Sequence, residues 1–148
     1  MSTTHGTKQN ALSPIQHTSS PSVSVYWLNQ AQVLTHLKQA VHRLAKRYPE
    51  IEEIWLFGSL ARGDAVPGSD ADLLIVLRQS PLSFLARSAH YQPDFCGVGV
   101  DTLAYTRAEL VAMQSENNPF LYQVQSEWLL LYPAEQTNKE RPTIAKET

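Results

Sequence analysis

Residues 56–77 read LFGSLARGDAVPGSDADLLIVL, and this stretch decides the fold. Its last part, residues 73–77, is apolar throughout, which is typical of a short strand buried on both faces. Asp70 and Asp72 lie at the start of that predicted strand, directly after the turn residues Pro67-Gly68-Ser69. Because strand residues two apart point to the same face, the two carboxylates should lie side by side.

The segment before the two aspartates has the residue types of an anion-binding turn. Gly58 allows the backbone to turn tightly and to approach a ligand without a Cβ in the way. Backbone N–H groups of a following helical turn would face an anion, and the Ser59 hydroxyl can donate as well. Arg62, one turn further on, can add a charge-assisted contact to phosphate.

The aspartates themselves indicate a metal site. Two like charges held close repel unless a cation lies between them, and Mg²⁺ bound by few protein carboxylates and by substrate phosphates suits this pair. Asp101 lies within another predicted strand, residues 98–105, where an isolated carboxylate is costly to bury. If the two strands are neighbours, Asp101 completes a three-carboxylate site. Two ions there could clamp the attacking and leaving oxygens of a phosphoryl-type displacement.

Each of these parts alone has a structural explanation. A Gly-Ser dipeptide is usually a loop, an Asp-x-Asp pair usually forms a turn or cap, and a strand aspartate usually faces solvent. The combination is more specific: Gly58-Ser59, ten intervening residues and then Asp70-Ala71-Asp72 match the GSx10DxD signature. The sequence resembles the DNA polymerase β-like nucleotidyltransferase superfamily, and in particular its small branch of minimal nucleotidyltransferases. Residues 100–110, VDTLAYTRAEL, are similar to the third-carboxylate strand and following helix of that branch.

The resemblance implies an enzyme that transfers AMP from ATP to a hydroxyl group and releases pyrophosphate. It implies that Asp70 and Asp72 hold two Mg²⁺ ions, and that Asp101 holds the catalytic ion and helps to activate the acceptor. Gly58 and Ser59 would bind the triphosphate. We add Arg62 on charge grounds, and Ser69 as a residue that could cap or orient Asp70.

The resemblance also implies a partner. Minimal nucleotidyltransferases typically act with a HEPN-domain toxin, as antitoxins that add AMP to a tyrosine of it in a type VII-like toxin–antitoxin module. The short chain, without an acceptor domain of its own, agrees with that expectation. Two alternatives remain open: a small-molecule hydroxyl such as that of an antibiotic, or an RNA end, as acceptor, and a non-catalytic module that masks a toxin.

The rest of the chain predicts an α/β (α+β) domain with a small mixed sheet covered by helices, the fold of that superfamily. We assign residues 1–23 to a flexible Ser/Thr-rich tail, 24–132 to the nucleotidyltransferase domain and 133–148 to a polar tail. Cap and periodicity signals predict the remaining elements. These are a helix from the Asn29 cap to about 48, a strand at 54–57, a helix at about 80–91, a helix from the Thr106 capping box to about 114, a helix after Asn118-Pro119 and a strand at 128–132.

Composition narrows the setting of the protein. The 148 residues carry 12 Lys plus Arg and 14 Asp plus Glu, for a net charge of −2. This balance and the lack of a basic groove argue against direct nucleic-acid binding. Apolar runs of at most five residues are too short to span a membrane. The single Cys96 cannot form an internal disulfide, so we expect a cytoplasmic protein.

Overall fold

The protein, described here from a computed structural model of residues 15–19, 24–94 and 96–133, is built around a mixed four-stranded sheet. The strand order is β5-β4-β3-β6. The β4 and β5 strands are parallel, whereas β3 is antiparallel to both β4 and β6. The bounds are β3 Ile51–Phe57, β4 Ala71–Leu77, β5 Val100–Thr106 and β6 Leu129–Tyr132. The predicted small mixed sheet is therefore confirmed.

Five helices accompany the sheet within the described residues: α2 Gln30–Arg47, α3 Ser59–Arg62, α4 Phe84–His90, α5 Arg107–Ser115 and α6 Pro119–Glu127. The cap predictions are confirmed. The Asn29 side chain accepts from the Gln32 N–H at the start of α2, and Asn118 accepts from the Leu121 N–H at the start of α6. Thr106 and Glu109 form both bonds of a capping box.

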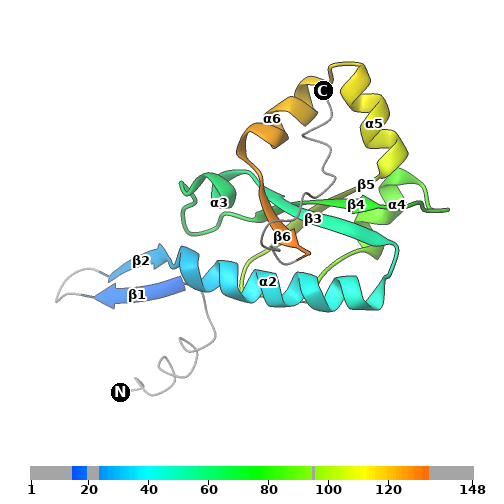
Figure 1. The fold of residues 1–148 in the computed structure, drawn as a ribbon. Coiled ribbons are helices and arrows are strands. Elements are labelled where there is room, and N and C mark those ends of the chain that lie inside the picture. Colours follow the sequence, from blue (N-terminus) through cyan, green and yellow to red (C-terminus); the bar gives the residue numbers. More distant parts are fainter. Residues whose placement is uncertain (1–14, 20–23, 95, 134–148) are drawn as a thin grey trace.

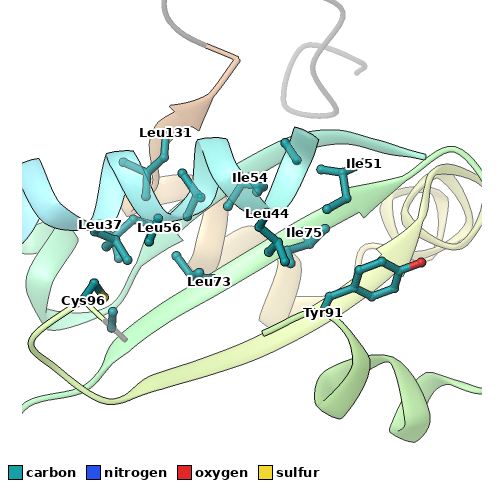
Figure 2. Packing of buried hydrophobic residues seen from close by; sticks show 14 of the residues in the cluster. Leu37, Leu44, Ile51, Ile54, Leu56, Leu73, Ile75, Tyr91, Cys96 and Leu131 are labelled. Atoms are coloured by element: carbon teal, nitrogen blue, oxygen red, sulfur yellow. The ribbon is translucent and has the colours of Figure 1, made fainter. Parts of the chain in front are cut away.

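The helices cover the two faces of the sheet, as Figure 1 shows, with α2 on one side and α5 and α6 on the other. The apolar stripe of α2, which includes Leu37 and Leu44, is fully buried against Leu56, Leu73 and Ile75 of the sheet (Figure 2). Burying such side chains contributes about 1.5–3 kcal/mol each, so this face supplies much of the stability.

The opposite face forms a second core beneath α5 and α6. Trp55, Leu74 and Val76 of the sheet pack there against buried side chains of the two helices. The Trp55 and Trp128 rings stack with centroids 3.9 Å apart. Strand residues thus alternate between two cores, which explains why residues 73–77 are apolar without interruption.

Two predicted boundaries were wrong. The β3 strand begins at Ile51 rather than at residue 54. The first residues of this strand include two glutamates that are hydrogen-bonded. Glu52 accepts from Arg107 at 2.8 Å, and the buried Glu53 accepts from the Trp55 indole at 2.8 Å. The helix expected to open at residue 80 begins only at Phe84, because Ser83 rather than Ser80 is its cap.

Part of the expected N-terminal tail is a strand. Ile15–Ser19 (β1) pairs antiparallel with Ser24–Leu28 (β2), in a two-stranded sheet separate from the main one. Figure 1 shows this hairpin beside the N-terminal end of α2. A ladder held by backbone bonds does not require the apolar alternation that the prediction relied on. Residues 1–14, 20–23 and 134–148 of the predicted tails lie outside the described residues.

None of the helices that the structure describes is both long enough and apolar enough to cross a bilayer.

Candidate functional site

The sheet places two of the three predicted carboxylates next to each other. Asp72 of β4 is in register with Asp101 of the parallel neighbour β5 and, on its other side, with Phe57 of β3. The open condition of the sequence prediction, that the two strands be neighbours, is met. A cross-strand row of Phe57, Asp72 and Asp101 therefore begins the site.

This row lies on the α5 and α6 face of the sheet. Asp72 is on the same face of β4 as Leu74 and Val76, which pack beneath those helices. A pocket of about 520 Å³ adjoins the row and is lined by Phe57, Asp72, Asp101 and Phe120, among others. The Phe57 and Phe120 rings pack edge to face with their centroids 5.9 Å apart. They form an apolar wall of the pocket beside the carboxylates.

The environment of Asp72 disfavours its charge. Partial burial and the nearby Asp101 and Asp70 carboxylates raise the pKa of Asp72 above its ordinary value. Repulsion between these carboxylates does not stabilise the folded protein. It is the electrostatic condition that a bound cation would relieve.

Asp70 lies just before β4, two residues ahead of Asp72, and it is exposed. Its carboxylate faces Gly99, where an added Cβ would come within 2.5 Å of Asp70 Oδ1. The Ala71 N–H donates to the Gly99 carbonyl oxygen at 2.8 Å, which fixes this loop against the start of β4.

The backbone of Gly58 lies against the Asp72 carboxylate. It has a positive φ of 80°, and a Cβ there would collide with the Asp72 carboxylate. Glycine is thus required twice, for the backbone conformation and for the space. Ser59 follows as the first residue of α3 and is partly exposed. The predicted turn therefore lies directly against Asp72, whereas Asp70 lies against Gly99.

Arg62 and Ser69 have partners that the sequence did not reveal. The Arg62 guanidinium donates to Asp64 at 3.2 Å and to Glu127 at 3.3 Å, and these bonds raise its pKa. The Ser69 hydroxyl accepts from the Val66 N–H at 3.0 Å and so closes its own turn. Within this structure Ser69 acts on the turn before Asp70 rather than on the Asp70 side chain.

Three residues of the site were missed at the sequence level. Phe120 lies in the pocket wall, and Thr102 lines the same pocket with a buried hydroxyl that lacks a hydrogen-bond partner among the described residues. Glu127, at the end of α6, binds the Gly58 N–H at 2.7 Å. Nothing local in the sequence marks them, because each reaches the site only through the packing of α6 or the edge position of β5.

The donor set fits a hard divalent cation, since adjacent carboxylate oxygens with unrelieved negative charge are what Mg²⁺ prefers. Among the residues that the structure describes, no three or more His, Cys, Asp or Glu side chains gather closely enough to hold an ion. An ion held by all three aspartates would therefore need their side chains to turn toward one another.

The chain is similar to a known domain family and to two solved structures. The chain matches the nucleotidyltransferase domain family over residues 37–122, a range that contains every predicted site residue. No curated protein matches it. A candidate nucleotidyltransferase from Sulfolobus solfataricus is 24% identical, with a TM-score of 0.48, over 68% of this chain and 80% of that one. A toxin–antitoxin structure containing AMP-PNP is 17% identical, with a TM-score of 0.43, over 64% of this chain and 72% of that one. Since the domain match spans more than half of the sequence, the chain belongs to the nucleotidyltransferase domain family.

Proposed function

We propose that this chain transfers AMP from Mg²⁺-bound ATP to a tyrosine hydroxyl of a HEPN-domain toxin, and that this modification makes it the antitoxin of the pair. The observation that carries the proposal is the register of Asp72 with Asp101, directly beside the Gly58 turn. The resemblance to minimal nucleotidyltransferases supports the choice of acceptor and partner.

The residues divide the reaction between two sides of the site. Asp70, Asp72 and Asp101 would hold Mg²⁺, which offsets the charge of the nucleotide and of the leaving pyrophosphate. The turn formed by Gly58 and Ser59 would receive the phosphates, and its position next to Asp72 would direct the α-phosphorus toward the carboxylates. This division keeps the leaving group on the turn side and the acceptor on the pocket side.

The acceptor hydroxyl enters from the pocket, beside Asp101. Its oxygen forms a bond to the α-phosphorus, the bond from that phosphorus to the bridging oxygen breaks, and pyrophosphate leaves. Asp101 accepts the hydroxyl proton as the bond forms. The rings of Phe57 and Phe120 give this side of the pocket an apolar wall, against which the acceptor would lie.

A label-transfer assay tests the proposal. The protein, Mg²⁺ and ATP labelled in the α-phosphate are mixed with the protein encoded next to it. We expect label on the neighbour's tyrosine, lost with Asp72→Ala and kept with Glu116→Gln, which removes an exposed carboxylate at the end of α5. Neutralisation of the neighbour that survives Asp70→Ala plus Asp72→Ala would refute an enzymatic antitoxin. Label on a small alcohol alone would assign a different acceptor.

A further inference from the structure

Glu127 ties the end of one helix to the turn that precedes the aspartates. It is the last residue of α6, and its side chain is only 10% exposed. Its Oε2 accepts the Gly58 N–H at 2.7 Å, and both carboxylate oxygens lie 3.3 Å from Arg62 Nη1. A single carboxylate thus joins α6 to the first and last parts of the β3–α3 turn.

The position is an unusual place for a negative charge. The C-terminal end of a helix carries a partial negative charge of its own, so an acidic side chain there is normally unfavourable. Glu127 is held in spite of this by Gly58, by Arg62 and by Gln123, whose amide donates at 3.1 Å. Burial alone would raise the pKa of Glu127, but these bonds together hold it below its usual value. The carboxylate is therefore held by three donors from the turn and from its own helix.

The contacts determine how the turn presents its donors. Gly58 has φ 80° and ψ −161°, a conformation in which its N–H points to Glu127 while its Cα side lies against Asp72. Arg62 uses Nε for Asp64 and Nη1 for Glu127, and neither contact uses Nη2. Two carboxylates thus hold the guanidinium in one orientation and leave its Nη2 to donate to a phosphate.

We propose that Glu127 is a positioning residue for nucleotide binding: by holding the Gly58 N–H and Arg62, it keeps the β3–α3 turn in the conformation that receives the triphosphate. This inference rests on the proposed function, because it requires the turn to bind ATP. The opposite role for Glu127 would be to compete with phosphate for the Gly58 N–H and the Arg62 guanidinium. The two roles predict opposite changes in affinity.

Binding of a non-hydrolysable ATP analogue with Mg²⁺, and of tripolyphosphate alone, distinguishes them by calorimetry without any acceptor. We expect Glu127→Ala to weaken both about tenfold, the scale of one lost charge-assisted contact. Glu127→Gln keeps an oxygen for the Gly58 N–H but no charge for Arg62, so it should weaken binding less. Glu116→Gln is the matched control and should bind like the unmodified protein.

Two further measurements separate positioning from a general loss of structure. The amide proton of Gly58 should shift in ¹⁵N-resolved NMR spectra of Glu127→Ala, while amides of α2 stay unchanged. In turnover, KM for ATP should rise more than kcat falls. If Glu127→Ala does not fold, Glu127→Gln decides on the same readouts.

The outcomes are distinguishable. Equal or tighter binding by both Glu127 variants would overturn the positioning role and leave the proposed function intact. Failure of the unmodified protein to bind the analogue would overturn both.

Discussion

The two ends of the parallel β4–β5 pair differ in how their charged side chains are paired. At the start of these strands, Asp72 faces Asp101 and has Asp70 nearby, so like charges crowd together. Beyond the end of β5, Arg87 and Glu109 form an ion pair with the closest atoms 2.7 Å apart. Arg87 also donates to the carbonyl oxygens of Leu82 and Ala104.

The difference separates a charge that holds the fold together from the charges that we propose to perform chemistry. The nearly buried Arg87 is matched by acceptors, as a charge needs to be inside a protein. The aspartates are not matched, and the pKa of Asp72 is raised as a result. A perturbed carboxylate beside a pocket is a mark of a functional site. Substitutions at the two ends should therefore affect different quantities.

The largest effect is expected from Asp72→Asn. It should lower nucleotidyl transfer about a thousandfold, since each 1.4 kcal/mol of lost transition-state stabilisation costs a factor of ten. Because the folded protein raises the pKa of Asp72, removing its charge should leave the melting temperature unchanged or higher at neutral pH. A transfer assay and thermal unfolding of the same preparation check both. A marked fall in melting temperature would mean that Asp72 is a structural residue.

Gly58→Ala should disturb both the backbone conformation of the β3–α3 turn and its packing against Asp72. The alanine would have to adopt φ 80° and would collide with Asp72, for a combined cost of about 3 kcal/mol. The free energy of unfolding from urea titration measures this cost. Gly68→Ala is the control, because its φ of 96° carries the same strain while no atom lies within 4 Å of its Cβ. Equal losses in the two variants would show that the contact with Asp72 is unimportant.

The comparison also shows which features the sequence could predict. Caps, apolar periodicity and the GSx10DxD spacing are local patterns, so the helices, the central strands and the Asp70–Asp72 pair were predicted from short segments. The contact of Asp72 with Asp101 depended on strand order, which the sequence left open. The structure supplies that order through the β4–β5 register.

The features that were missed depend on distant parts of the chain. Glu127 reaches Gly58 across 69 positions, and the Phe57 wall needs Phe120 of α6. The acidic start of β3 looked unlike a buried strand because its partner, Arg107, lies 55 residues away. The β1–β2 hairpin was missed for another reason, since a backbone ladder leaves little trace in apolar patterning.

Glu109→Gln tests the ion pair between Arg87 and Glu109 at the end of β5. Glutamine keeps the capping box while removing the charge that faces Arg87, so we expect a loss of about 2 kcal/mol in the free energy of unfolding. Transfer activity per folded molecule should change less than twofold. Urea titrations and transfer rates of the two proteins at neutral pH provide the measurement.

The same variant should show a defined pH dependence. The hydrogen bond from Arg87 holds the pKa of Glu109 below its ordinary value. The stabilisation is therefore complete above the unfolded pKa of about 4.3 and is lost as the pH falls through the lower folded value. The gap between Glu109→Gln and the unmodified protein should stay constant from about pH 6 to 8 and shrink below about pH 4. A gap that widens in acid would contradict the assignment.

The smallest effect is the stabilisation that Mg²⁺ should give at the three aspartates, and measuring it needs no substrate. If Mg²⁺ relieves the repulsion among the aspartates, it binds the folded protein better than the unfolded chain. At ten times its dissociation constant it should then stabilise the fold by about 1.4 kcal/mol. Thermal unfolding with and without MgCl₂ measures this gain, and matched ionic strength in NaCl controls for screening. Asp72→Asn should lose most of the gain, whereas Glu109→Gln should retain it in full, because its altered charge lies at the far end of β5. An equal gain in all three proteins would place the ion elsewhere and remove the electrostatic argument for the aspartate site.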